Sequence, residues 1–263
     1  MKILEINSSY RKNGNTEHII RLIEHNLTKS AKEKKLDIDI EYLSIADNNI
    51  SACLGCRACF DRGEEKCPLR DDLTDVRTKL MAADGIILGS PVYVEDINGI
   101  MKNWIDRMAF YCHRPAFMGK SALVLTTSGG GATNHALRTM KNALSAWGFR
   151  IAAQKNFRMG AYMKNGETEK SYGDMAGKLA EDLIKSIIKN NSFQPSFYSY
   201  LIFKVQQKYW QKEMHQDNKY DYEFWKKKGW LKPECVYYIE HKAAPVKSRL
   251  ARFLGSIAAK FFI

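Results

Sequence analysis

Long apolar runs and prolines are both scarce in this 263-residue sequence. No stretch approaches the ~18 consecutive apolar residues of a membrane-spanning helix. The apolar run at the start is interrupted by Glu5 and is too short for a secretory signal. A disordered chain is excluded as well, because 45% of the residues are hydrophobic and only 6 are prolines. We expect a packed globular protein of the cytoplasm.

Familiar nucleotide-binding and hydrolase motifs are also absent. The sequence has neither the G-x-G-x-x-G fingerprint of dinucleotide-binding loops nor the G-x-x-x-x-G-K-[ST] loop of ATP-binding proteins. No nucleophile, histidine and aspartate stand in a pattern that indicates a catalytic triad. Dinucleotide-binding and ATP-binding loops, and a catalytic triad, are therefore not supported by the sequence.

Cysteine is infrequent, with six residues, but four of the six lie within 15 positions. These four form the pattern C-x2-C-x2-C-x7-C, in which the last cysteine precedes a proline: Cys53, Cys56, Cys59 and Cys67. Such spacing is typical of a ligand set rather than of a disulfide framework. Similar runs hold iron–sulfur clusters in bacterial ferredoxins, and four thiolates also bind tetrahedral zinc. An iron–sulfur cluster is our first interpretation, with free or redox-active thiols and zinc as alternatives.

Acidic residues are outnumbered, and the imbalance is concentrated toward the C-terminus. The net charge is +12; residues 193–263 contain 13 Lys and Arg against 6 Asp and Glu, whereas residues 1–192 contain 28 against 23. A basic surface favours anionic partners such as phosphorylated cofactors, acidic electron-transfer proteins, nucleic acid or anionic lipid. Charge by itself does not choose among them.

Apolar segments alternate with amphipathic ones over residues 1–190. Between the apolar segments we expect helices, as where Ile19, Ile23 and Leu27 share one helical face. Strands are expected at residues 2–7, 38–43, 85–90, 122–126 and 151–157. This alternation predicts an α/β fold with a doubly wound, five-stranded parallel sheet. Ligands of such sheets bind at the carboxyl ends of the strands, where the strand order reverses.

Residues 191–263 differ in composition and are predicted to form an aromatic, basic C-terminal extension. The extension ends in a basic amphipathic helix over residues 246–263. Its apolar face is formed by Val246, Leu250, Phe253, Leu254, Ile257 and Phe261. We expect this helix to pack on its own domain or on a second copy of the chain, and peripheral contact with a membrane is the alternative. Nucleic acid is not an expected partner.

Polar or glycine-rich loops follow three of the predicted strands. The first loop precedes a helix, so its amides and hydroxyls suit a phosphate group. The second contains Pro91, which fixes the backbone, and Tyr93, which offers an aromatic face. The third contains three successive glycines, which let a planar ring approach the backbone closely.

The three loops, SSYRKNGNT, GSPVYVEDINGIMKNWIDR and TTSGGG, resemble the flavin loops of the NAD(P)H-dependent FMN reductase branch of flavodoxin-like proteins. The resemblance covers residues 1–190, with a departure at Val94 and Glu95, where relatives commonly have an aromatic residue and a glycine. It implies that the loops bind, in turn, the FMN phosphate, the isoalloxazine ring and the far edge of that ring. The implied contacts are Ser8, Arg11, Asn13, Asn15 and Thr16; then Pro91, Val92, Tyr93 and Val94; then Thr127, Ser128, Gly129 and Gly130.

The cysteine loop, within residues 47–70, resembles the compact motif of the iron–sulfur flavoproteins, a subset of the same family. The resemblance implies a [4Fe-4S] cluster beside FMN in an oxidoreductase that takes electrons from NAD(P)H or a reduced carrier protein. One alternative is a cluster-free NAD(P)H-dependent flavin, quinone or nitro reductase. The other is a non-enzymatic electron carrier of flavodoxin type. A homodimer or higher homo-oligomer is expected, because flavodoxin-like reductases commonly dimerise.

Overall fold

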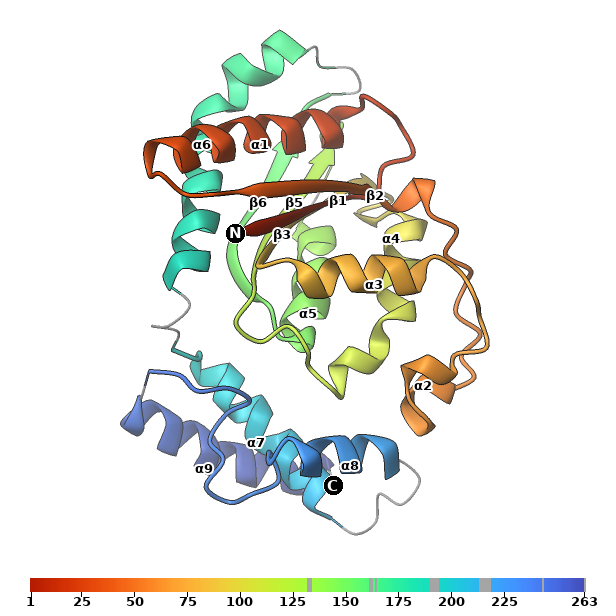
Figure 1. The fold of residues 1–263 in the computed structure, drawn as a ribbon, viewed down its shortest axis with the longest axis vertical. Helices are drawn as coiled ribbons and strands as arrows, with labels where there is room; N and C mark the ends of the chain where they lie inside the picture. Colours follow the sequence, from red (N-terminus) through yellow and green to blue (C-terminus); the bar gives the residue numbers. More distant parts are fainter. Residues whose placement is uncertain are drawn as a thin grey trace. The chain divides into compact units, whose positions relative to one another are not determined.

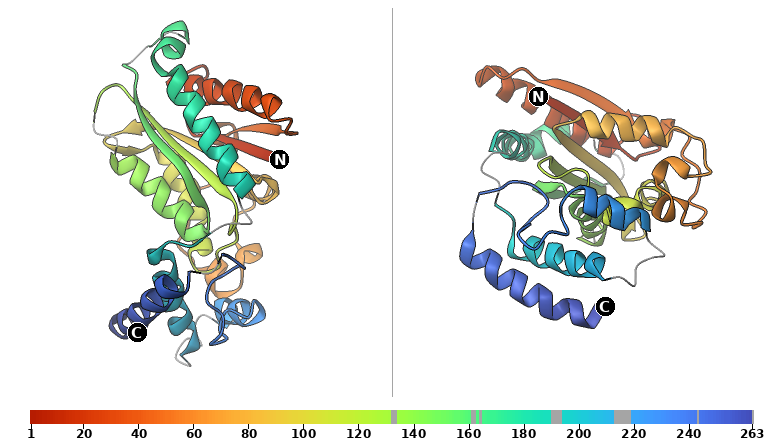
Figure 2. Two further views of the ribbon diagram at one scale, coloured as in Figure 1. Left: turned by 90° about the vertical axis from the view of Figure 1, so that its left-hand side faces the viewer. Right: turned by 60° about the horizontal axis from the view of Figure 1, so that its bottom comes forward.

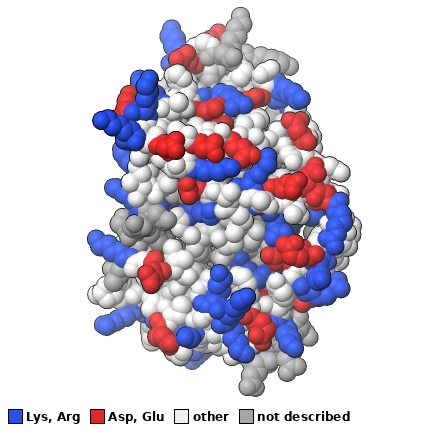
Figure 3. All heavy atoms as spheres, in the orientation of Figure 1, with Lys and Arg blue, Asp and Glu red and all other residues white. Residues whose placement is uncertain are grey.

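A computed structural model describes residues 1–131, 134–160, 163, 165–189, 194–212, 219–242 and 244–262. The chain forms two compact units. The sheet unit comprises Met1–Leu54 and Leu69–Ile188, and the helical unit comprises Gly55–Pro68 and Lys189–Ile263. On the face drawn in Figure 3, acidic and basic side chains are interspersed, so the surplus of positive charge is not gathered into one patch there.

The sheet unit is built on parallel strands in the order β2-β1-β3-β5-β6 (Figure 1). The strands are β1 (Lys2–Asn7), β2 (Asp39–Ser44), β3 (Gly85–Tyr93), β5 (Ser121–Ser128) and β6 (Arg150–Arg158). This order reverses between β1 and β3, so the predicted doubly wound, five-stranded parallel sheet is confirmed. A two-residue strand, β4 (Asp96–Ile97), pairs antiparallel with the end of β3 and was not expected.

Helices cover both faces of the sheet (Figures 1 and 2). One face carries α1 (Asn15–Glu33) and α6 (Asn165–Ile188), and the other carries the remaining long helices of the unit. Those are α3 (Leu73–Ala82), α4 (Gly99–Arg107) and α5 (Asn134–Trp147). Because both faces are covered, β5 is buried along its whole length, which explains the apolar run at residues 122–125.

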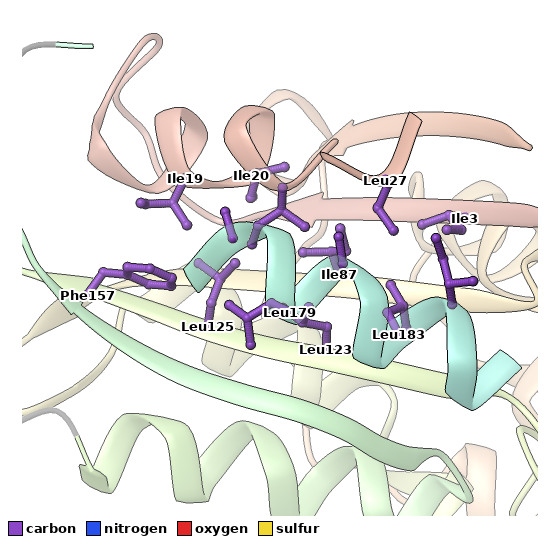
Figure 4. Packing of buried hydrophobic residues seen from close by; sticks show 14 of the residues in the cluster. Ile3, Ile19, Ile20, Leu27, Ile87, Leu123, Leu125, Phe157, Leu179 and Leu183 are labelled. Carbon is purple, nitrogen blue, oxygen red and sulfur yellow. The ribbon is translucent and has the colours of Figure 1, made fainter. Parts of the chain in front are cut away.

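The core between the sheet and helices α1 and α6 is aliphatic (Figure 4). Ile19, Ile20 and Leu27 of α1 are fully buried against the sheet and against Leu183 of α6. Burying an Ile or Leu side chain stabilises a fold by about 1.5–3 kcal/mol, so this one stripe fixes α1 on the sheet. The loop that precedes α1 is thereby fixed as well.

The helical unit contains the segment 55–68 and the C-terminal helices. Its helices are α2 (Ala58–Asp61), α7 (Phe197–Gln211), α8 (Lys219–Lys227) and α9 (Pro245–Phe262). Its core is aromatic: the ring of Phe203 stacks on Trp225 at 5.8 Å, and Trp225 meets Trp230 edge-to-face at 5.2 Å. The crowding of aromatic residues in the C-terminal sequence therefore forms a small core of its own.

Glu5 of β1 is an ionisable side chain buried in the sheet unit. Its carboxylate lies 3.6 Å from the Arg21 guanidinium, and neither carboxylate oxygen accepts a hydrogen bond from the described residues. Burial and the nearby charge of Glu24 raise the pKa of Glu5 to about 8, while Arg21 acts in the opposite direction. Near neutral pH the folded protein therefore keeps this carboxyl protonated for much of the time.

Glu5→Gln is expected to remove a pH dependence of stability. Because the folded pKa of about 8 lies above the ordinary value of 4.5, the contribution of protonated Glu5 is complete below pH 4.5 and is lost as the pH rises through 8. The advantage of the variant in free energy of unfolding should therefore grow by roughly 3 kcal/mol between pH 5 and pH 8. Urea unfolding at both pH values measures it, with Glu33→Gln at the exposed end of α1 as control. An unchanged pH dependence in Glu5→Gln would contradict the expectation.

Candidate functional site: a polar cleft at the carboxyl edge of the sheet

Three loops meet at one edge of the sheet because the strands that precede them are parallel. Asn7 at the end of β1 stands opposite Gly89 of β3, and Pro91 of β3 stands opposite Thr127 of β5. The chain leaves all three strands at this edge. The sequence segments that resemble flavin loops are thus brought together by the register of the sheet.

The first loop leaves the N-terminus of α1 without a side-chain cap. The Asn7 side chain accepts the Ser9 amide at 2.9 Å, and the Ser9 hydroxyl accepts the Arg11 amide at 3.1 Å. Gly14 is the N-cap of α1 and offers no side-chain acceptor to the first helical amides. Such amides, at the positive end of the helix dipole, are a ready site for a phosphate group.

Side-chain hydrogen bonds tie the loops to one another. The hydroxyls of Thr16 and Thr127 lie 2.7 Å apart and are buried. The buried Asn98 side chain donates to the Ser8 carbonyl at 2.5 Å. Its oxygen accepts the Met101 amide and caps α4. These bonds fix the loops in place before any ligand arrives, which lowers the entropic cost of binding.

A cleft of about 150 Å³ opens where the three loops meet. Nine of the predicted contacts line it: Arg11, Asn15, Thr16, Pro91, Val92, Tyr93, Thr127, Ser128 and Gly129. Three lining residues were not among the predicted contacts: Ser9, Gly14 and Gly160. Ser9 stands beside a predicted residue, but Gly160 follows β6 and carried no sequence signal. Its carbonyl accepts a hydrogen bond from Asn15 at 3.0 Å.

Four predicted contacts lie outside the lining of the cleft. The Ser8 hydroxyl is fully buried and donates to the Gly89 carbonyl at 3.4 Å. Asn13 instead lines a larger cavity of about 470 Å³ along α1 and the start of α6. Val94 is 98% exposed, and Gly130 lies next to the lining residue Gly129 without lining the cleft itself.

Val94 and Glu95 form a strained turn at the rim of the second loop. Their φ angles are +48° and +67°, and they connect the paired residues Tyr93 and Asp96. Two positive φ angles in a two-residue hairpin loop are typical of a type I′ turn, for which Asn and Gly are the usual residues. A β-branched valine in this conformation is rare, because its side chain crowds the backbone. The two residues at which this sequence departs from the family pattern thus occupy a turn that disfavours a valine.

The cleft fits FMN by two observations. The Ser128 hydroxyl is buried at its edge and has no hydrogen-bond partner among the described residues, which leaves it available to a ligand. A Cβ atom built on Gly129, Gly130 or Gly131 would meet nothing within 4 Å, so open space borders this backbone. Both features suit a planar ring with polar edges next to the third loop.

Comparison with known proteins agrees with this geometry. Residues 1–163 match the family described as NADPH-dependent FMN reductase. An iron-sulfur flavoprotein of Archaeoglobus fulgidus is 30% identical over 232 residues, which cover 88% of this chain and 100% of that protein. The chain belongs to this family, in its iron–sulfur flavoprotein subset.

Two further proteins are similar to this chain over different fractions of its length. The iron-sulfur flavoprotein MJ1083 of Methanocaldococcus jannaschii is 39% identical over 107 residues, or 41% of this chain and 51% of that protein. The structure of RosB with a bound riboflavin-phosphate derivative has a TM-score of 0.55 at 16% identity and covers 72% of this chain and 79% of that one. The likeness to RosB concerns the fold alone.

The four cysteines of the flavoprotein motif are present as thiols. Cys53 and Cys56 are exposed, whereas Cys59 and Cys67 are partly buried. As donors, four thiols at this spacing suit an iron–sulfur cluster. The described residues nevertheless contain no group of three or more His, Cys, Asp or Glu side chains that is arranged to hold a metal ion. The structure therefore provides suitable donor atoms, but the described residues do not form an assembled metal site.

A buried ion pair in the sheet unit joins the two ends of the cysteine segment, which we define as the residues between Ser51 and Asp71; these joined ends are its base. The Arg107 guanidinium donates to both carboxylate oxygens of Asp71, at 2.6 and 3.2 Å, and to the Ser51 carbonyl at 2.7 Å. Burial alone would raise the pKa of Asp71, but hydrogen bonds from Arg107 and from the Ser51 and Leu73 amides hold that pKa below its usual value. Residues 51 and 71, which flank all four cysteines, are thus joined through one side chain of α4.

Within the helical unit, the cysteine segment packs on the C-terminal extension. Helix α2, which contains Cys59, contacts α8. The Tyr220 ring of α8 lies so close to Gly63 that a Cβ there would be 2.6 Å from the ring. Gly63 also has a φ angle of +97°, which disfavours any other residue. The C-terminal extension therefore supports the backbone between Cys59 and Cys67.

Arg107→Met is expected to lower the free energy of unfolding by about 3–5 kcal/mol, because it leaves the Asp71 carboxylate buried without its partner. The double variant Arg107→Met/Asp71→Leu should recover much of this loss. The contribution of Asp71 is present above pH 3.8 and is lost as the pH falls through its lowered pKa. Urea unfolding measures these values.

The matched control for the ion pair is Lys102→Met on the same helix. Lys102 pairs with Asp106 at 2.5 Å, and about half of each side chain is exposed. Its loss should cost at most ~0.5 kcal/mol. Equal effects of Arg107→Met and Lys102→Met would show that the Asp71 pair does not hold the base of the segment.

Proposed function

We propose that the protein is an FMN-dependent oxidoreductase that takes electrons from NAD(P)H or a reduced carrier protein. We further propose that Cys53, Cys56, Cys59 and Cys67 hold a [4Fe-4S] cluster. The observation that carries the proposal is the cleft, in which three features meet: an open helix N-terminus, a glycine backbone, and a buried hydroxyl with no hydrogen-bond partner in the described part of the chain. The family matched by residues 1–163 is described as NADPH-dependent, and relatives are named iron-sulfur flavoproteins.

The side chains of the cleft bind and orient the cofactor. Arg11 and the first amides of α1 neutralise the phosphate, since both present positive charge at the same loop. Pro91 and Tyr93 flank the ring, and the Ser128 hydroxyl donates to or accepts from its polar edge. Bound FMN supplies hydride and single-electron transfer.

The described lining of the cleft contains few ionisable side chains. Among its described lining residues, Arg11 and Tyr93 are the only ones with ionisable side chains, and neither is a carboxylate nor an imidazole. If the purified protein oxidises NAD(P)H with a soluble acceptor, that activity would support the proposal of an enzyme. If it shows no such activity, a non-enzymatic electron carrier would be favoured.

Ser128→Ala is expected to weaken FMN binding about fivefold, because one net hydrogen bond contributes ~1 kcal/mol. Quenching of flavin fluorescence during titration of the apoprotein measures the affinity. Ser145→Ala, at an exposed position of α5, is the control and should bind FMN as the unchanged protein does. Unchanged affinity in Ser128→Ala would remove this hydroxyl from the proposed contacts.

Protein purified without oxygen is expected to contain iron, acid-labile sulfide and FMN, with a broad visible absorbance beneath the flavin bands. Cys56→Ser should lose the iron and the broad absorbance while it retains FMN. Cys235→Ser is the matched control and should retain both, since Cys235 lies outside the motif and its thiol donates to the Tyr237 carbonyl. Flavin without iron would refute the cluster and leave the FMN proposal intact, and stoichiometric zinc would identify a tetrahedral zinc site instead.

We also propose that the protein works in the cytoplasm. Four closely spaced thiols are compatible with a reducing compartment, whereas an oxidising one favours disulfides. Helices able to cross a membrane are not found in the described part of the chain.

A further inference from the structure

Helix α9 leaves its bulky apolar residues exposed instead of packing them within the helical unit. Val246, Phe253 and Phe261 are 80%, 63% and 84% exposed. Leu250, Leu254 and Ile257 are exposed as well. Because an α-helix turns ~100° per residue, these six side chains fall within one arc of about 100°. A contiguous apolar stripe of this kind is a mark of an interaction surface, whereas single exposed apolar residues are ordinary.

The opposite side of α9 consists of small residues and packs on α7. Ala251, Gly255 and Ala259 recur at every fourth position and are buried. A Cβ on Gly255 would lie 2.8 Å from the Leu201 carbonyl of α7, so the two helices approach closely (Figure 2). This close contact requires small side chains and fixes the rotation of α9. The bulky stripe therefore cannot turn inward while the two helices remain packed.

Every charged side chain on α9 is basic. Lys247 flanks the apolar stripe on one side, and Arg249 and Lys260 flank it on the other; Arg252 lies nearer the packed side, where it donates to the Pro233 carbonyl at 2.9 Å. The helix contains no acidic residue. Cations beside an apolar stripe place positive charge level with the surface that the stripe would enter.

We propose that α9 docks the protein on an anionic lipid surface, lying in the plane of the membrane interface. The six apolar side chains enter the boundary between head groups and acyl chains, and Lys247, Arg249 and Lys260 contact the anionic head groups. The helix lies on the membrane rather than across it, because its cations are distributed along its length. A second copy of α9 is a poorer partner, since it would bring like charges together around the same stripe.

Vesicle flotation with the full-length, flavin-loaded protein tests the proposal. We expect association with phosphatidylcholine vesicles that contain about one-third phosphatidylserine, and at least tenfold weaker association with phosphatidylcholine alone. Leu250→Ser/Phe253→Ser/Ile257→Ser should weaken binding to the anionic vesicles at least tenfold. These positions are exposed, so the variant keeps the packed side of α9; circular dichroism and FMN content verify that it folds.

Two further variants separate the contribution of the cations on α9 from that of exposed apolar residues in general. Arg249→Gln/Lys260→Gln should weaken binding roughly tenfold and reduce its dependence on salt, while the apolar stripe stays intact. Met81→Ser/Ile188→Ser removes two exposed apolar residues outside α9 and should bind as the unchanged protein does. Equal binding by the triple serine variant, or no binding to anionic vesicles, would overturn the proposal. Light scattering that showed self-association abolished by the same triple variant would also overturn it, and would assign the stripe to a second copy.

Discussion

The parallel pairing of β1, β3 and β5 is the constraint on which the cleft depends. The chain leaves parallel strands at the same edge of the sheet. Three loops that are far apart in sequence therefore become neighbours through strand pairing alone. The hydrogen bond between Thr16 and Thr127 and the one from Asn98 to Ser8 then set the spacing of these neighbours. The aliphatic core under α1 supports this arrangement, because it fixes the helix whose first amides face the cleft. The position of the cleft is thus set first by the topology of the sheet and only then by individual side chains.

The cysteine segment is held differently, because its two ends are joined to each other by hydrogen bonds. Its flanks at Ser51 and Asp71 meet on Arg107, so the intervening loop is closed by a buried, bidentate ion pair. Holding two chain positions together reduces the conformational freedom that such a loop must lose when its side chains gather around a ligand. Beyond the base, Gly63 and Tyr220 pack the segment against the C-terminal extension within the helical unit. Four thiols that are not assembled into a metal site therefore lie on a backbone that is already constrained.

Local sequence signals predicted the sheet well, because strands buried on both faces contain continuous apolar runs, such as residues 122–125 in β5. They do not mark the start of α6 at Asn165, because the first turns of this helix are polar and show no apolar periodicity. They also missed β4, which is too short to show a pattern. In the cleft, the missing information was tertiary. Nothing near Ser8 in the sequence shows that its hydroxyl turns to the Gly89 carbonyl, and nothing near Gly160 shows that it lies beside Asn15.

Helix α9 shows why periodicity alone cannot orient a helix. Its apolar stripe is evident from spacing, and the simplest interpretation places such a stripe toward the protein core. The structure reverses this orientation because Ala251, Gly255 and Ala259 allow α7 to approach at a distance that bulky side chains would prevent. Burial of the small side satisfies the packing of the helical unit, so the bulky side adds nothing to that packing. Six large apolar side chains that do not stabilise their own unit, set among cations, are best explained by a surface outside the protein that is both apolar and anionic.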